Sequence, residues 1–200
     1  IFWYLAADSC NIRIVLIKNG TSLTDLNIIK IKYKIDYIAK KITKNLKVKI
    51  KNNKNKRKIR NDILFTSGTL SIPKGVILSE KSYLHVANIL IKKLKQKDND
   101  IELLSMPFDH SFGLVRLRCC ILAGTKMLVT DGLKNFPEVY KFSQVNQLSG
   151  LSLVPSGLVL LKLLLKNKVK LFCKNLKYLE IGSSHINKDI RSWLRENFIN

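Results

Sequence analysis

Residues 63–78 read ILFTSGTLSIPKGVIL and combine two apolar runs with small polar residues and a lysine. This stretch begins with the apolar run 63–65 and ends with the apolar run 76–78, and each run is typical of a strand. Small, hydroxylated and cationic residues lie between them. A polyphosphate requires several donors, close approach of the backbone and a cation, and this segment has hydroxyls, amides beside a glycine and a lysine. We therefore predict a phosphate-binding loop.

The segment does not have the GxxxxGK[ST] pattern of a Walker loop. Counted from Gly68, that pattern requires glycine where Pro73 stands and a hydroxyl where Gly75 stands. A Walker loop also opens directly into a helix, whereas a strand is predicted here. The alternative to a phosphate site is a Ser/Gly turn between two strands with a solvated lysine.

The loop resembles the signature of the adenylate-forming superfamily, written [ST]SG[ST][TS]Gx-P-K-G, which includes acyl-CoA synthetases, luciferases and adenylation domains of peptide synthetases. The positions that match are Thr66, Ser67, Gly68, Thr69, Pro73, Lys74 and Gly75. Leu70 stands where the family usually has Thr or Ser, and Ser71 where it usually has Gly. If that glycine adopts a positive φ, serine there costs about 1 kcal/mol and makes the loop less pliable.

The resemblance implies that this loop binds the β- and γ-phosphates of ATP, with Lys74 as a catalytic cation. The residues implied in ATP binding are Thr66, Ser67, Gly68, Thr69, Ser71, Lys74 and Gly75.

A second motif, MPFDHSFGL at residues 106–114, resembles the PxxHxxG segment of the same family. Pro107, His110 and Gly113 match it. The resemblance implies that His110 borders the pocket for the acyl substrate and acts in catalysis. A histidine that packs in the core or caps a helix is the alternative.

Two further turns resemble family landmarks. The SLVPS string at 152–156 resembles a turn whose neighbours line the acyl pocket, and EIGSSHIN at 180–187 resembles the GGAPL turn beside adenine. Gly182 matches that turn, whereas Ser183 stands where the family has Gly. Gly182 and Ser183 are therefore implied in adenine binding, and a plain strand-to-helix turn is the alternative.

Strands and helices alternate after the loop, which predicts an α/β fold with a layered, largely parallel sheet flanked by helices. The predicted strands are 13–17, 37–38, 63–65, 76–78, 101–105, 126–130, 151–154 and 176–181, and the end of a helix is predicted at 1–7. Helices are predicted over 23–33, 116–123, 137–145 and 158–165. Two more are predicted after the caps Ser79 and Asn187, and the helix after Ser79 has an apolar stripe of Tyr83, Val86, Leu90 and Leu94.

We expect an incomplete N-terminal domain of an adenylate-forming enzyme. Residues 1–62 are interpreted as an opening α/β layer with a basic connector, and residues 63–200 as the phosphate-loop and acyl-pocket portion. The chain begins inside an apolar run and stops just after a predicted helix, so it is expected to be a fragment without the C-terminal domain.

The chain is strongly basic, with 36 Lys and Arg against 14 Asp and Glu and a formal charge of +22. The lysines are spread along the chain, and the cluster at 49–60 lacks the interleaved aromatic residues of a single-strand-binding surface, so a nucleic-acid partner is disfavoured. The four cysteines lack metal-site spacing and are predicted to be reduced core thiols, and no metal site is predicted. The longest apolar run, 157–165, is too short to span a membrane, and these features favour the cytoplasm.

The resemblance implies ATP-dependent activation of a small-molecule carboxylic acid as an acyl-adenylate, followed by thioester formation. The implied cofactors are ATP and Mg²⁺, with CoA or the phosphopantetheine of an acyl carrier protein as acceptor. The 200 residues alone are expected to be inactive. A non-catalytic nucleotide-binding or scaffold module is the main alternative, and a basic nucleic-acid-binding protein is the weaker one.

Overall fold

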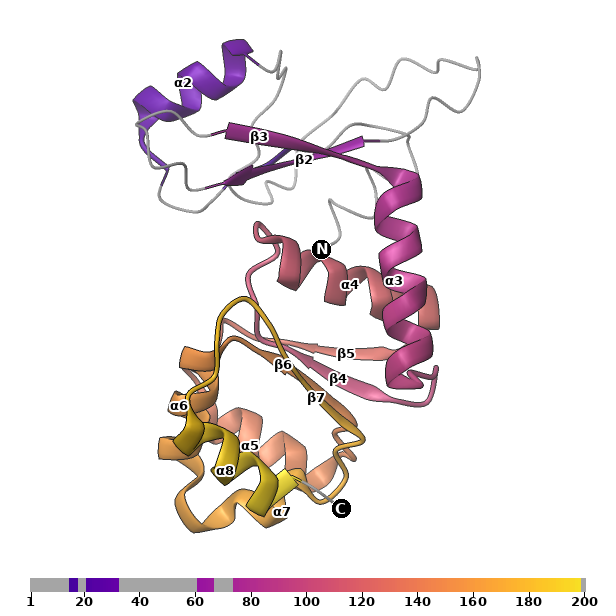
Figure 1. Ribbon diagram of the computed structural model, residues 1–200, viewed down its shortest axis with the longest axis vertical. Coiled ribbons are helices and arrows are strands. Elements are labelled where there is room, and N and C mark those ends of the chain that lie inside the picture. Colours follow the sequence, from indigo (N-terminus) through magenta and orange to yellow (C-terminus); the bar gives the residue numbers. More distant parts are fainter. Residues whose placement is uncertain (1–14, 18–20, 33–60, 67–73, 199–200) are drawn as a thin grey trace. The chain divides into compact units, whose positions relative to one another are not determined.

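The computed structural model describes residues 15–17, 21–32, 61–66 and 74–198. The chain forms two compact units, Ile1–Tyr83 and Leu84–Asn200 (Figure 1). The predicted helix end at 1–7, the strand at 37–38, the basic cluster at 49–60 and residues 67–73 lie outside the described residues.

The first unit contains a three-stranded sheet in the order β1-β2-β3. Its elements are β1 (Val15–Leu16), α2 (Leu23–Lys32), β2 (Asn61–Thr66) and β3 (Lys74–Ser79). β1 is parallel to β2, and β2 is antiparallel to β3. The predicted strands at 63–65 and 76–78 are confirmed, but each is longer, because the backbone pairing continues toward the loop on both sides.

α3 (Glu80–Leu94) follows β3 directly, and Ser79 caps it as predicted. The Ser82 amide donates a hydrogen bond of 3.2 Å to Ser79 Oγ. The predicted apolar stripe is wrong at Val86, which is 46% exposed, whereas Ala87 is fully buried. Ala87 lies four residues after the buried Tyr83, so the buried stripe follows the i, i+4 spacing at this point.

The second unit contains a four-stranded sheet in the order β5-β4-β6-β7. All its strands are parallel, which confirms the predicted parallel α/β layer. Its elements are β4 (Ile101–Leu104), α4 (Ser111–Ala123), β5 (Lys126–Val129), α5 (Phe136–Val145), β6 (Gly150–Leu153), α6 (Pro155–Leu165), η1 (Lys166–Lys168), α7 (Val169–Cys173), β7 (Tyr178–Ile181) and α8 (Lys188–Phe198).

The two faces of this sheet differ in polarity. One face is covered by α5 to α8 (Figure 1). Leu103, Leu151 and Leu153 on that face pack with buried side chains of these helices in one apolar core. The opposite face lies toward α4. Residues on that face include Glu102, Gly150, Ser152, Tyr178 and Glu180, beside the apolar Leu104, since neighbouring side chains along a strand alternate between faces.

Local signals at the helix ends explain most of the boundaries. Gly124 ends α4 with φ of 69°, a left-handed conformation that glycine adopts without strain. α6 begins at Pro155, three residues before the predicted start, because proline is favourable in the first turn of a helix. Asn187 Oδ1 accepts a hydrogen bond of 2.9 Å from the Ile190 amide, which confirms the predicted cap of α8. No helix among the described residues combines the length and apolarity that a membrane crossing requires.

Candidate functional site

Three turns meet at the carboxyl ends of the parallel strands in the second unit. The Gly182 amide after β7 donates a hydrogen bond of 3.2 Å to the Leu153 carbonyl at the end of β6. The ring of Phe112, at the start of α4, lies so close to Gly182 that a Cβ there would be 3.1 Å from a ring carbon. The structure therefore brings the segment of His110 and the turn of Gly182 together. This end of a parallel sheet is where ligands bind in open α/β folds.

The spacing of Pro107 and Gly113 has a direct structural reason. The first turn of α4 folds back against the preceding turn, and a Cβ at Gly113 would lie 2.1 Å from the Pro107 carbonyl oxygen. Any side chain at residue 113 would collide with fixed backbone. The two motif residues therefore set the path of the chain on either side of His110.

His110 occupies the N-cap position of α4. Its carbonyl accepts a hydrogen bond of 3.0 Å from the Leu114 amide, but its side chain makes no capping hydrogen bond. The imidazole is exposed. A core position is excluded for this histidine, and its role beside the acyl substrate stays a prediction.

Ser183 adopts a backbone conformation that favours glycine, with φ of 84°. Ser183 stands where the family that the turn resembles has Gly. A serine in this backbone conformation therefore carries a conformational cost. Its side chain is exposed. Contact of Gly182 and Ser183 with adenine stays a prediction.

The predicted phosphate loop is closed by an antiparallel hairpin in the first unit. Thr66 is the last residue of β2 and pairs with Lys74, the first residue of β3. Thr66, Lys74 and Gly75 were expected between the strands, and they lie within them, because the ladder extends to the Thr66–Lys74 pair. The remaining predicted ATP-binding residues, Ser67, Gly68, Thr69 and Ser71, lie outside the described residues.

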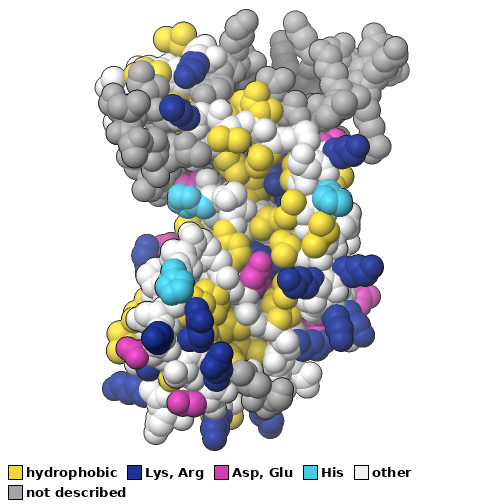
Figure 2. Space-filling view, viewed as in Figure 1, with side chains coloured by type: hydrophobic (Ala, Val, Ile, Leu, Met, Phe, Trp, Pro, Cys, Tyr) yellow, Lys and Arg dark blue, Asp and Glu magenta, His cyan; other side chains and the backbone are white. Residues whose placement is uncertain are grey.

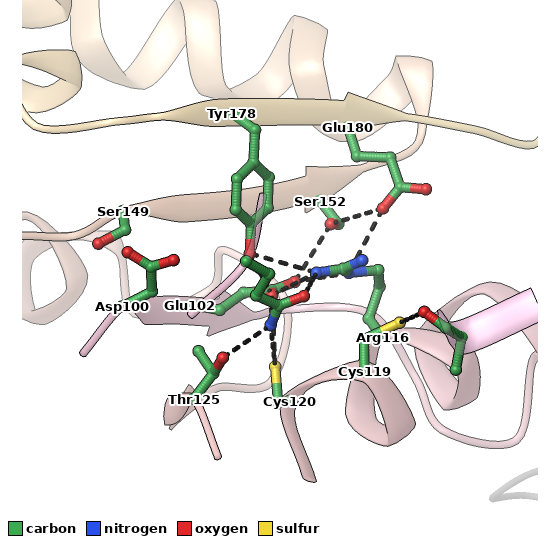
Figure 3. A network of polar contacts seen from close by, with 12 residues as sticks. Asp100, Glu102, Arg116, Cys119, Cys120, Thr125, Ser149, Ser152, Tyr178 and Glu180 are labelled. Atoms are coloured by element: carbon green, nitrogen blue, oxygen red, sulfur yellow. Dashed lines mark hydrogen bonds and ion pairs between the residues drawn. The ribbon is translucent and has the colours of Figure 1, made fainter. Parts of the chain in front are cut away.

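A buried ion pair lies between α4 and the sheet (Figure 3). Arg116 Nε and Nη2 donate to the two carboxylate oxygens of Glu102 at 2.7 Å and 2.5 Å. The two side chains are 1% and 0% exposed. Arg116 Nε also lies 3.3 Å from Glu180 Oε2, so one guanidinium faces two carboxyl groups.

Neutral groups complete the network. Tyr178 donates to Glu102 Oε2 at 2.6 Å, and Gln96 donates to the same oxygen at 3.2 Å. Ser152 bridges toward Glu102 and Glu180 at 3.3 Å each. The Tyr178 ring crosses Gly150, where a Cβ would lie 2.3 Å from the ring, so this arrangement requires glycine on β6.

Burial controls the protonation of these groups. Burial raises the pKa of Tyr178, and the neighbouring Glu102 raises it further, so the phenol stays neutral. Burial also raises the pKa of Glu180, while Arg116 and Ser152 act to lower it. For Arg116 burial acts to lower the pKa, but the hydrogen bonds and charge of Glu102 outweigh it and keep the guanidinium charged.

The three cysteines among the described residues are unreactive thiols, with Cys119 and Cys120 buried and Cys173 partly buried. Burial raises the pKa of Cys119 to about 11 and that of Cys173 to about 12, which opposes thiolate formation. Cys119, Cys120 and Cys173 form no disulfide. Among the described residues, no group of three or more His, Cys, Asp or Glu side chains is arranged to hold a metal ion.

The ion-pair network was not predicted from the sequence, although a signal was present. Glu102 and Glu180 interrupt apolar strands, and Arg116 lies within an apolar stretch of helix. Alternation with apolar residues along each strand places Glu102 and Glu180 on one face of the sheet. Their partnership depends on strands that are distant in sequence, so no local motif contains it.

The parallel sheet with its helices, together with the turns at its carboxyl ends, is the architecture of the N-terminal domain of adenylate-forming enzymes. A sequence model described as "AMP-binding enzyme" matches residues 9–200, so the chain belongs to that family. The dapdiamide synthesis protein DdaD of Enterobacter agglomerans is 27% identical over 132 residues, which cover 64% of this chain and 22% of that protein.

Solved structures share the fold. O-succinylbenzoate coenzyme A synthetase (MenE) of Bacillus subtilis, in complex with AMP, matches with a TM-score of 0.59 at 20% identity, over 68% of this chain and 28% of that one. The N-terminal domain of FACL13 from Mycobacterium tuberculosis matches with a TM-score of 0.60 at 19% identity, over 70% and 35%. ATP-bound MatB of Rhodopseudomonas palustris matches with a TM-score of 0.57 at 22% identity, over 66% and 26%. The chain thus spans about a third or less of each relative's length.

Proposed function

We propose that the protein to which this chain belongs activates a carboxylic acid with ATP. The acid attacks the α-phosphate, giving an acyl-adenylate and pyrophosphate. The thiol of CoA or of a carrier protein then attacks the acyl carbonyl, forming a thioester and releasing AMP. Membership of the AMP-binding family supports the first half. The observation that carries the proposal is the pairing of Thr66 with Lys74, which closes the predicted phosphate loop at its base.

The hairpin explains how the loop can be positioned. Backbone pairing fixes Thr66 and Lys74 opposite each other, so both ends of segment 67–73 are held. The Lys74 side chain is exposed and can approach the β- and γ-phosphates as they become the leaving group. Catalysis of this step consists mainly of positioning and charge stabilisation. The ATP-bound state of MatB supports ATP as the nucleotide.

The second unit is proposed to hold the acid and the adenine. His110 borders the acid, and Gly182 with Ser183 approaches the adenine from the turn after β7. The meeting of Phe112 and Gly182 supports this assignment, because it brings the two predicted motifs to one end of the sheet. Mg²⁺ is proposed to accompany ATP, and no described residue is assigned to it.

A nucleotide-binding or scaffold protein without catalysis is the second candidate. Ser183 at φ of 84° favours it, because a strained residue stands where the family has glycine. Leu70 and Ser71 also depart from the family loop.

A nucleic-acid-binding role has less support. On the face drawn in Figure 2, the Lys and Arg side chains are spread among apolar and neutral ones. We propose a cytoplasmic location.

The test is ATP–pyrophosphate exchange by the full-length protein with a panel of carboxylic acids. Lys74→Met should slow exchange roughly ten- to a hundredfold, the equivalent of ~1.5–3 kcal/mol for one charge-assisted hydrogen bond. Lys81→Met changes another exposed lysine of the same unit and should leave the rate unchanged. Saturable ATP binding without exchange would support the second candidate. Equal exchange rates for both variants would exclude a role for Lys74 in ATP binding or catalysis. Exchange by the 200-residue chain alone would contradict its expected inactivity.

A further inference from the structure

A narrow crevice lies behind the turn that carries the PxxHxxG motif. It is lined by residues of β4, β6 and α4 and of the turn between β4 and α4. Met106 and Phe108 of that turn are partly exposed, whereas the other described lining residues are buried. The crevice therefore extends from the carboxyl end of the sheet, where the acid is proposed to bind, into the interior.

Two buried polar atoms are left without hydrogen bonds at this crevice. Ser105 Oγ and Arg116 Nη1 have no hydrogen-bond partner among the described residues. Ser105 is 5% exposed and Arg116 is fully buried, and both residues line the crevice. Buried donors almost always find a partner in native structures, so two such atoms at one crevice indicate a partner that enters it.

The surrounding charges define what kind of partner fits. The guanidinium of Arg116 is already paired with both oxygens of Glu102 and lies 3.3 Å from Glu180 (Figure 3). An added carboxylate would therefore meet two acidic groups around one cation. An uncharged hydrogen-bond acceptor meets no such repulsion. Arg116 Nη1 can only donate, and the Ser105 hydroxyl can donate or accept, so a hydroxyl or a carbonyl group satisfies both.

The crevice has to widen before a ligand group enters. The side chains leave no space wide enough for a water molecule in the present geometry, so water does not satisfy the two atoms. Met106 and Phe108 are the partly exposed residues of the lining, and Met106 has a flexible, unbranched side chain. A change of the Met106 rotamer would widen the crevice.

We propose that this crevice is the inner end of the acid pocket, and that Ser105 and Arg116 bind an uncharged polar group of the substrate. The substrate is then a carboxylic acid that carries a hydroxyl, ketone or amide group along its chain, rather than a plain saturated fatty acid. This inference rests on the proposed function. A plain alkyl chain would leave both buried groups unpaired, and sites built to hydrogen-bond a substrate discriminate strongly against analogues without that group.

The experiment compares kcat/KM in pyrophosphate exchange by the full-length protein for pairs of acids of equal length. One acid of each pair carries a hydroxyl or keto group at a varied position, and the other is the alkyl acid. We expect the best polar acid to exceed its alkyl partner at least tenfold, and Ser105→Ala to reduce that ratio by about tenfold. Ser143→Ala removes another buried serine hydroxyl, on α5 outside the crevice, and should preserve the ratio.

The outcomes separate this inference from the function on which it rests. If alkyl acids support exchange as well as or better than their polar partners, the inference is overturned and the proposed function stands. If Ser105→Ala preserves the ratio, Ser105 does not bind the substrate and the inference is likewise overturned. If no acid supports exchange, the proposed function itself fails. Thermal unfolding of Ser105→Ala should match that of the wild type, because the hydroxyl removed has no partner among the described residues.

Discussion

Replacement of Arg116 by Met should strongly destabilise the second unit. The Arg116 and Glu102 side chains are 1% and 0% exposed, so the variant leaves the Glu102 carboxylate buried without its cation. Breaking a buried ion pair by removing one partner costs about 3–5 kcal/mol. Tyr178, Gln96 and Ser152 still donate to that carboxylate, but these neutral groups do not balance its charge. The expected loss is a large share of the stability of a typical domain, about 5–15 kcal/mol.

Urea denaturation measures this loss. Circular dichroism follows the whole chain, and Trp fluorescence in a Trp3→Phe background follows the second unit, because Trp193 on α8 is then the remaining tryptophan. The matched control is Lys134→Met, which removes the cation of the ion pair with Asp131. That pair is 78% and 84% exposed, so its loss should cost less than about 1 kcal/mol. The combined variant Glu102→Gln with Arg116→Met should be more stable than the sum of the single losses, because neither charge is then left alone.

A small effect of Arg116→Met would refute this reasoning. If its free energy of unfolding lies within about 1 kcal/mol of that of Lys134→Met, the buried pair does not contribute in the way that its geometry indicates. Additive effects in the combined variant would show that Glu102 and Arg116 are not coupled.

Two further predictions concern the turn after β7 and the carboxyl group near it. Ser183→Gly should raise the free energy of unfolding by about 0.5–1 kcal/mol, because glycine adopts φ of 84° without strain. The control Ser184→Gly should lower the free energy of unfolding by a similar amount, because glycine increases the entropy of the unfolded chain. Thermal melts that shift in the same direction for both variants would contradict this prediction. Burial raises the pKa of Glu180 in the folded state despite Arg116. The stability linked to this carboxyl group is therefore fully present below its usual pKa, about 4.3, and is lost as the pH rises through the pKa of the folded state. In denaturation curves measured at increasing pH, Glu180→Gln should remove this decline in the free energy of unfolding. The control Glu138→Gln, at an exposed position of α5, should retain it. Equal pH dependence of the free energy of unfolding in both variants would exclude Glu180 as the cause.

Much of the fold was predictable from local patterns. The strands of the parallel sheet, the cap at Ser79, the end of α4 at Ala123 and the cap at Asn187 were all predicted, and the structure confirms them. These features depend on side chains within a few residues of each other, so a single sequence contains the necessary information. The boundaries were less accurate. Thr66 and Lys74 belong to strands because their backbones pair with each other, and that pairing is a property of two segments.

The motif segments were also found from sequence, but their spatial relation was not. The PxxHxxG spacing identified Pro107 and Gly113, and the structure adds the reason, a backbone approach that no side chain permits. The contact between Phe112 and Gly182 joins residues that are far apart in the chain. Only the folded sheet, with β6 between β4 and β7, brings those two segments to one edge.

Local sequence patterns were sufficient to identify the family, the parallel α/β class and the candidate phosphate, acyl and adenine segments, because loop chemistry and strand and helix periods are local properties. The network of Glu102, Arg116, Tyr178 and Glu180 is a product of the tertiary structure alone. So is the crevice lined by Ser105 and Arg116, each of which has a buried polar atom without a partner among the described residues. Hydrogen bonding and burial of this kind depend on which distant segments pack together, and packing is settled by the whole fold.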